Sequence, residues 1–451
     1  MPARGPGYPA LVIATASVRD TARVVGEVLT PIVAQGVIAR RRRAVALAGA
    51  LGLDERGVRT MREMRDRYGS GPLRLRVPVR PMAVLLTPEH VHRVLTDSPE
   101  PFAAATLEKR GALRHFQPHG VLVSHGRLRE ERRRFVESAL DTGKPVHRCA
   151  EAFTRVAREE ARVLLDRADA RGVLDWDAYI QAWWRVVRRI VFGDGARDDH
   201  ETTDLLTRLR ARGNWSGFAP RRPDLEARLR ERLQEYVTRA EAGSLAALVA
   251  AGPPTLAVDP VGQLPQWLFA FDAAGMAAYR ALALFAAHPE QAARARSELT
   301  GRDLARPQDL PLLRAGVLES VRLWPTTPIV LRETTEPTGW EGATLPAGTG
   351  LLIVSAFFHH DGTAVPDADR FVPDRWCDGS AEDNWALVPF SAGPAVCPGR
   401  ELVLFSTSTF LAALVERHDA RALPPFPLEA RRPVPAALDP FALRFVLVPH
   451  G

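Results

Sequence analysis

The chain has 451 residues, of which 46% are hydrophobic and 25% charged. This balance is that of a globular protein whose core is large enough to enclose a cofactor, and it excludes fibrous and disordered chains. The net charge of +7 comes almost entirely from arginine, because lysine occurs only at Lys109 and Lys144. No zinc-finger or RNA-recognition motif accompanies the charge, so nucleic acid is not expected as a partner.

Cysteine use and hydropathy bear on the compartment. Cys149, Cys377 and Cys397 are widely spaced and odd in number, which does not indicate a disulfide framework. We therefore expect a reducing, cytoplasmic environment. No uncharged apolar run reaches about 18 residues, so no membrane anchor is expected.

The N-terminal half begins with a basic run, Arg40 to Arg43, which reads as a solvated helix face. Short strands are predicted at 74–77 and 82–86, and Thr87-Pro88-Glu89 then starts a helix. Long amphipathic helices are predicted within 145–195 and 200–250.

The C-terminal half is predicted to contain a central helix over 263–288. It carries only Asp272 and Arg280 as charged residues, which is typical of a buried helix. Further helices begin at Pro289 and at Leu312, and Pro325 stops the second. Short strands follow over 329–332, 351–354 and 441–448. The sequence thus predicts one domain over 1–451, mainly α with small β-sheets.

The strongest chemical signal is the loop from Phe390 to Gly399, FSAGPAVCPG, which precedes an apolar helix beginning near Arg400. Gly393 and Gly399 permit tight turns and close approach to a flat cofactor. The free N–H groups at the start of the helix point back toward the Cys397 sulfur and lower its pKa. An isolated cysteine is usually a structural core residue, but the surrounding pattern favours a thiolate ligand.

A second feature is the pair Glu319 and Arg322, which share one face of a helix at i and i+3. Their apolar neighbours indicate that the pair is buried, and a buried pair needs further polar partners. Arg370, in the segment PDADRF, is predicted as the third partner.

These motifs resemble the cytochrome P-450 superfamily from about residue 120 to the C-terminus. Phe390, Gly393, Cys397 and Gly399 match its F-x-x-G-x-x-x-C-x-G signature, and the E-x-x-R helix precedes it in the family's order. The resemblance implies the cytochrome P-450 fold, non-covalently bound haem b and Cys397 as the axial ligand of the iron. Glu319, Arg322 and Arg370 would be structural, behind the haem.

The same resemblance implies cations for the haem propionates. Arg332 lies in the strand where relatives place a propionate-binding arginine, and Arg129 with Arg133 fits the helix that supplies further donors. An alternative frame uses His125 and Arg129, and a solvated arginine cluster is the plain alternative. Relatives often carry Arg or His two residues before the cysteine, where this chain has Ala395.

The central helix departs from the family pattern A/G-G-x-D/E-T. Ala274 and Gly275 match the small residues beside the oxygen site, whereas Ala277 and Ala278 replace the acid and the alcohol that organise proton delivery. Three hypotheses follow: a monooxygenase with an atypical proton route, a peroxide-driven peroxygenase or oxidative-coupling enzyme, and a haem-containing binding protein with little oxygenase activity.

The resemblance also implies a substrate pocket and partners. We expect the pocket to be lined by Phe271, Ala274, Ala278, Thr327, Ile329 and Val330. The substrate is expected to be a small organic molecule, such as a bacterial secondary metabolite. Electrons would come from a separate ferredoxin and ferredoxin reductase, with Arg400 as a contact. Arg280 is expected to face away from the pocket, and His359-His360-Asp361 reads as a structural turn rather than a metal site.

Overall fold

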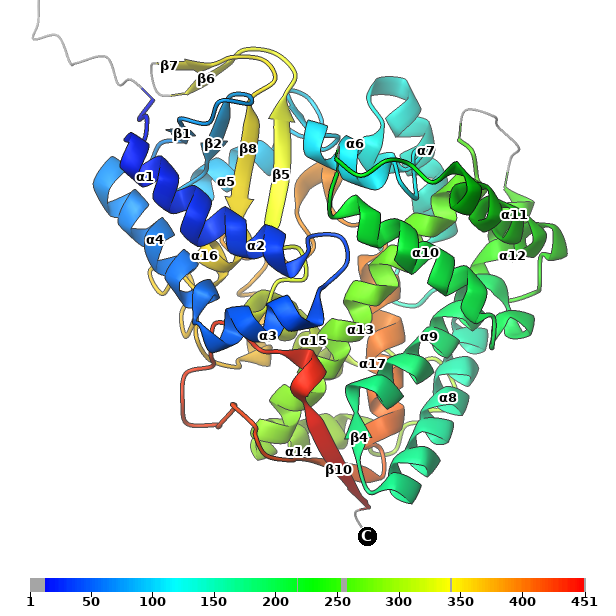
Figure 1. Ribbon diagram of the computed structural model, residues 1–451. Helices are drawn as coiled ribbons and strands as arrows, with labels where there is room; N and C mark the ends of the chain where they lie inside the picture. Colours follow the sequence, from blue (N-terminus) through cyan, green and yellow to red (C-terminus); the bar gives the residue numbers. More distant parts are fainter. Residues whose placement is uncertain (1–12, 217, 253–257, 341–342, 450–451) are drawn as a thin grey trace, which may run out of the picture.

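The computed structural model describes residues 13–216, 218–252, 258–340 and 343–449. The described chain is mainly helical, with the largest sheet at one side of the helical body and strands β4 and β10 at its lower end in the view of Figure 1. The helices are α1 Val18–Arg23, α2 Thr30–Gln35, α3 Arg42–Ala50, α4 Leu53–Tyr68, α5 Pro88–Thr96, α6 Leu107–Leu113, α7 Gly126–Ala139, α8 Ala150–Arg171, α9 Trp176–Phe192, α10 His200–Gly213, α11 Pro223–Arg239, α12 Leu245–Ala251, α13 Leu264–Ala287, α14 Pro289–Leu299, α15 Pro311–Leu323, α16 Ser355–His359 and α17 Arg400–Val415.

The strands form three sheets in the described part of the chain. They are β1 Leu73–Leu75, β2 Met82–Val84, β3 Phe102–Ala103, β4 Leu174–Asp175, β5 Ile329–Thr334, β6 Thr338–Trp340, β7 Ala343–Leu345, β8 Gly350–Val354, β9 His418–Ala422 and β10 Arg444–Pro449. The largest sheet has the order β1-β2-β8-β5-β3, and β4-β10-β9 and β6-β7 make the smaller ones. In the largest sheet β5 pairs antiparallel with β8, with Arg332 opposite Leu351.

Helix α13 lies at the centre of the helical body (Figure 1) and packs against α9, α15 and α17. It is apolar on nearly every side, which suits a helix surrounded by others. The segment Val261–Ala287, which contains it, is long and apolar enough to cross a membrane. Because 72% of its most apolar window is buried inside the molecule, its composition is that of a core helix.

Local sequence explains where the predicted long helices divide. Helix α8 ends at Gly172, whose φ of 66° is the left-handed conformation that glycine adopts readily. Asp175 then accepts a hydrogen bond from the Ala178 amide at 2.8 Å and caps the start of α9. The 145–195 segment is therefore two helices joined by a short strand.

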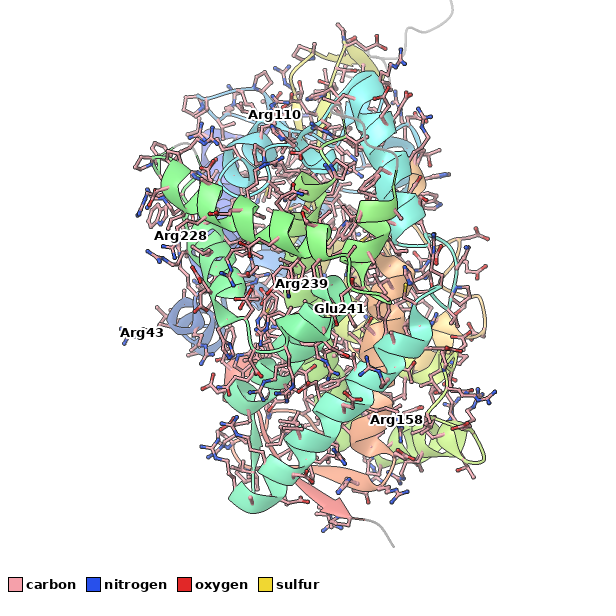
Figure 2. The ribbon with its side chains drawn as sticks, turned by 90° about the vertical axis from the view of Figure 1, so that its right-hand side faces the viewer. Arg43, Arg110, Arg158, Arg228, Arg239 and Glu241 are labelled. Atoms are coloured by element: carbon pink, nitrogen blue, oxygen red, sulfur yellow. The ribbon has the colours of Figure 1, made fainter. Side chains whose placement is uncertain are left out.

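The arginine run at 40–43 differs from the prediction of a solvated face. Arg40 donates to the Thr326 carbonyl oxygen at 3.1 Å, and burial lowers its pKa. Arg41 lies over the Trp215 ring, and Arg42 pairs with Asp177. Arg42 and Arg43 are exposed, and Arg43 lies at the edge of the molecule (Figure 2).

Candidate cofactor site

The Cys397 loop lies directly before α17, and the backbone holds it in a closed turn. The Cys397 amide donates to the Phe390 carbonyl oxygen at 3.0 Å. Burial raises the pKa of the Cys397 thiol, while a hydrogen bond from the Gly399 amide and the charges of Arg133 and Arg400 act in the opposite direction. The sulfur lies deep in the molecule although Cys397 as a residue is only partly buried, and a bound metal would favour the thiolate.

Gly393 fixes the approach of this loop to α5. Its φ is +64°, and an added Cβ would overlap the Leu95 carbonyl oxygen. Ser391, which also has a positive φ of 61°, accepts a hydrogen bond from Arg332 Nη2 at 3.0 Å. The loop is thus pressed on α5 at one point and tied to β5 at another.

Arg133 has a different set of partners from those predicted. Its Nη1 donates to the Val396 carbonyl oxygen at 2.7 Å, and its Nε pairs with Glu137 at 2.5 Å. The contact with Val396 places its guanidinium at the cysteine loop, where it braces the residue before Cys397. Binding of a haem propionate by Arg133 stays a prediction.

Arg332 and Arg129 form a cationic patch inside the molecule. Arg332 is 2% exposed, and burial, followed by the charge of Arg129, lowers its pKa to about 10. Its Nε donates to Ser98 Oγ at 2.9 Å. Arg129 is 7% exposed, and burial lowers its pKa. In the described ranges no carboxylate lies within ion-pair distance of either guanidinium, so the patch is complementary to an anion.

The position of His125 bears on the alternative prediction, in which His125 and Arg129 are the two propionate donors of this helix. His125 is the residue immediately before α7, and its ring lies 2.9 Å from Arg110 Nη1 at the surface. Arg129 follows one turn later and points inward. Of the residues proposed for this helix, Arg129 alone is buried without a carboxylate partner among the described residues.

Glu319 and Arg322 lie fully buried on α15 and make the ion pair that their spacing predicts, with Nε and Oε1 2.6 Å apart. The remaining Arg322 donors bind the carbonyl oxygens of His359, Ala368 and Arg370 at 3.2, 2.6 and 2.7 Å. The acceptors that a buried guanidinium requires are therefore supplied by α15, by the last residue of α16 and by the segment that follows it.

The third arginine is Arg375, not Arg370. Arg375 is 6% exposed and its Nε lies 3.3 Å from Glu319 Oε1, and the Trp376 indole donates to the same oxygen at 2.9 Å. The Arg370 side chain is exposed and reaches only Asp367, 3.8 Å away. A turn at Pro373–Trp376 causes the difference, because it directs the later arginine inward.

The central helix presents a different side from the one predicted. A Cβ on Gly275 would lie 2.5 Å from the Trp183 ring of α9, and the Phe271 carbonyl oxygen accepts a 2.7 Å hydrogen bond from the Trp183 indole. Ala274 and Ala278 are 3% and 0% exposed. Gly275 and Phe271 thus face α9 rather than an open pocket, which corrects their assignment to the oxygen site and the substrate pocket.

The partly open side of α13 lies elsewhere. Phe269, Ala270, Asp272 and Ala273 remain partly exposed although the helix is central. Ala273 is about 200° round the helix from Phe271. These residues therefore lie on a less covered part of the helix surface than Phe271 and Gly275, and Ala270 and Ala273 are its small residues.

Asp272 is the acid on this side, and no site role was predicted for it from the sequence. Its Oδ2 accepts a hydrogen bond from Arg210 Nη2 of α10 at 2.6 Å. The same nitrogen donates to the Ile38 carbonyl oxygen at 2.8 Å, and the Arg210 guanidinium lies over the Phe269 ring. One buried arginine thus holds the carboxylate, the N-terminal segment and α13 together.

The other predicted pocket residues lie at the start of β5. Thr327 is exposed and Ile329 is partly exposed, whereas Val330 is 6% exposed and packs in the core beneath the large sheet. Arg280 faces away from the predicted pocket, as expected: its Nε and Nη2 donate to the Leu438 carbonyl oxygen at 3.1 and 2.7 Å.

The histidine pair is structural in its contacts. His359 Nδ1 lies 3.0 Å from the Arg322 carbonyl oxygen, and its Nε2 accepts from the Val388 amide at 3.1 Å. Burial lowers the pKa of His359 to about 3 and that of His360 to about 4. No cluster of metal-binding side chains is found among the described residues.

Comparison with known proteins decides the family. The model of the family described as Cytochrome P450 matches residues 46–218 and 272–428. The chain belongs to the cytochrome P450 family. A relative from Streptomyces melanosporofaciens, cyclooctat-9-en-7-ol 5-monooxygenase, is 37% identical over 150 residues, which are 31% of this chain and 32% of that protein. A Penicillium ochrochloron cytochrome P450 monooxygenase, ptmK, is 35% identical over 27% of this chain and 26% of its own length.

Solved structures show the same fold. The retinoic acid-bound cyanobacterial CYP120A1 superposes with a TM-score of 0.69 at 20% identity and covers 86% of this chain and 94% of its own. The cytochrome P450 CYP102L1 gives 0.70 at 18% identity, with 87% and 94% covered. The fold expected from the cysteine-loop motif is confirmed.

Cytochromes P450 hold haem b, and the residues present fit that group. Cys397 offers an accessible sulfur beside the Gly399 amide. Arg129 and Arg332 lack carboxylate partners in the described ranges, which suits the two propionates of haem. Gly393 leaves room for the loop to lie flat against α5. The donor set therefore matches a planar, dianionic cofactor with one thiolate ligand.

Proposed function

We propose that the chain is a haem-thiolate monooxygenase in which Cys397 ligates the haem iron. The observation that carries the proposal is the Cys397 sulfur, held at the start of α17 by the Gly399 amide and still open to a ligand. A thiolate ligand pushes electron density onto the iron and favours cleavage of the O–O bond, which is the chemistry haem supplies when bound. Arg129 and Arg332 would bind the propionates and set the plane of the cofactor.

We assign proton delivery to Asp272 rather than to positions 277 and 278. Asp272 is partly exposed, and Arg210 holds one carboxylate oxygen at 2.6 Å. The other oxygen can hold and release a proton, and Ala273, the next residue, has no hydroxyl to share that work. This arrangement favours the use of molecular oxygen over peroxide, because dioxygen needs two protons delivered from outside whereas hydrogen peroxide carries its own.

The substrate class, the electron donor and the partner contact are also part of this proposal. The substrate is a small organic molecule, and the Streptomyces relative, named as a monooxygenase of cyclooctat-9-en-7-ol, supports an apolar bacterial secondary metabolite. Electrons come from a separate ferredoxin and its reductase in the cytoplasm. Arg400, exposed at the cysteine loop, is the contact we propose for an acidic partner.

Two experiments test the proposal. The reduced protein with carbon monoxide should show the red-shifted band of thiolate-ligated haem, and Cys397→Ser should abolish that band while Cys377→Ser, at an exposed site before the cysteine loop, keeps it. A band typical of histidine ligation in the unsubstituted protein would contradict Cys397 as the ligand.

The second experiment separates the oxidants. Asp272→Asn keeps an oxygen for Arg210 but cannot carry a proton, so turnover driven by NADPH, ferredoxin and reductase should fall about 10²-fold. Peroxide-driven turnover should stay unchanged. Equal turnover of both proteins with NADPH would remove Asp272 from proton delivery.

A further inference from the structure

We propose that Lys109 of α6 is a third cation of the propionate site and pairs with a haem propionate beside Arg332 and Arg129. The inference rests on the haem site described above. It assigns a residue that carries no motif, and it explains how the chain replaces the basic residue that relatives carry at the position of Ala395.

Lys109 converges with Arg332 on a single oxygen atom. Its Nζ donates to the carbonyl oxygens of Ala104 and Leu331 at 3.0 and 3.1 Å. Arg332 Nη1 donates to the same Leu331 oxygen at 2.9 Å. An ammonium has three donors, so one Nζ–H of Lys109 remains for another acceptor at the point where the two cations meet.

The nearby carboxylates are already engaged with other arginines. Both oxygens of Glu108 bind Arg80, at 2.9 and 2.6 Å. Glu333 binds Arg80 at 2.5 Å through one oxygen and lies 3.6 Å from Arg110 through the other. Neither acid is within ion-pair distance of Lys109. The two cations on the Leu331 oxygen are therefore unbalanced, with Arg129 as a further positive charge.

The surroundings of Lys109 agree with a site that awaits an anion. Burial, followed by the charge of Arg332, lowers the pKa of Lys109 to about 7, and Glu108 raises it only in part. The residue is nevertheless partly exposed. A propionate bound there would meet Lys109, Arg332 and Arg129 together.

The geometry predicts how haem affinity changes with pH. A propionate favours the charged ammonium, so the pKa of Lys109 is higher with haem bound than without it. At a pH below about 7 the ammonium is charged in both states and contributes fully. Above about 7 haem binding must take up a proton, so this contribution falls by up to about tenfold for each pH unit.

Lysine substitutions test the assignment with a matched control. Lys109→Met removes the charge at nearly constant length, Lys109→Arg keeps it, and Lys144→Met removes the only other lysine, which pairs with Asp141 at the surface. Haem is titrated into the cofactor-free proteins from about pH 6 to about pH 8.5, on either side of the shifted pKa. Circular dichroism of each cofactor-free variant reports folding.

Lys109→Met should weaken haem binding about 10- to 100-fold at the lower pH, as expected for loss of a charge-assisted hydrogen bond. Its deficit should shrink at the higher pH. Lys109→Arg should retain the affinity and remove this part of the pH dependence, and Lys144→Met should match the unsubstituted protein. Unchanged haem affinity in a folded Lys109→Met protein would overturn the proposal.

The dimethyl ester of iron protoporphyrin IX identifies the source of the carboxylate. Without propionate charges, the unsubstituted protein and Lys109→Met should bind it equally. A deficit that persists with the ester would overturn the pairing. Normal haem binding by Lys109→Met together with weaker binding of laurate would also overturn the pairing. That result would place a substrate carboxylate, and not a propionate, at Lys109. A thiolate-type carbon monoxide band in the unsubstituted protein separates failure of this assignment from failure of the haem site itself.

Discussion

Replacing Gly393 by alanine tests the geometry of the cysteine loop. The φ of +64° costs a non-glycine residue about 1–2 kcal/mol. The new methyl group would also overlap the Leu95 carbonyl oxygen, well inside the 3.0 Å that Cβ atoms keep, and relieving such an overlap costs about 1–3 kcal/mol. We expect Gly393→Ala to lower the free energy of unfolding by about 2–5 kcal/mol in total.

Gly301→Ala is the matched control, because Gly301 has a φ of +75° with open space around it. It should cost only the backbone contribution of about 1–2 kcal/mol. Urea unfolding of both variants gives the difference, and the carbon monoxide spectrum reports whether the sulfur has shifted. Equal destabilisation of the two variants, with an unchanged spectrum, would refute the close approach of the loop to α5.

Two further predictions concern the buried network. Arg375→Gln should destabilise the protein by about 3–5 kcal/mol, because it removes a buried partner of Glu319, whereas Arg370→Gln should change stability by less than about 0.5 kcal/mol; urea midpoints compare them. His359 has its pKa lowered to about 3 in the folded chain, so its contribution is present above pH about 6.5 and is lost as the pH falls toward 3. The free energy of unfolding should change by at most about 1.4 kcal/mol per pH unit through this group, and His359→Gln should reduce that slope. An unchanged slope in urea unfolding from about pH 7 to about pH 5 would contradict the role of His359.

Local motifs could be predicted from the sequence because the spacing of residues within one helix or turn fixes their relative positions. Glu319 and Arg322 must meet on any helix, and the glycines around Cys397 fix a turn before a helix. Arg375 was missed because the partner of Glu319 is selected by a turn at 373–376, and chain order alone favours the earlier Arg370. The signal that could have found it is Trp376, an aromatic donor directly beside the arginine.

The orientation of the central helix could not be read from composition. Ala273-Ala274 and Ala277-Ala278 are equivalent as runs of small residues, and only Trp183, about 90 positions earlier, shows which side is closed. The role of Lys109 could not be predicted from the sequence for a similar reason. It depends on the contact of α6 with β5, and no sequence pattern within α6 predicts that contact.

Arg322 and His359 have a consequence for how the ligand sulfur is prepared. The guanidinium fastens the end of α16 to α15, and the imidazole of His359 at that end accepts a hydrogen bond from the Val388 amide, two residues before Phe390. The strand of chain leading to the sulfur is thus anchored by protein groups alone. This segment therefore loses its conformational entropy when the protein folds. Little of the free energy of iron coordination is then needed to order the polypeptide.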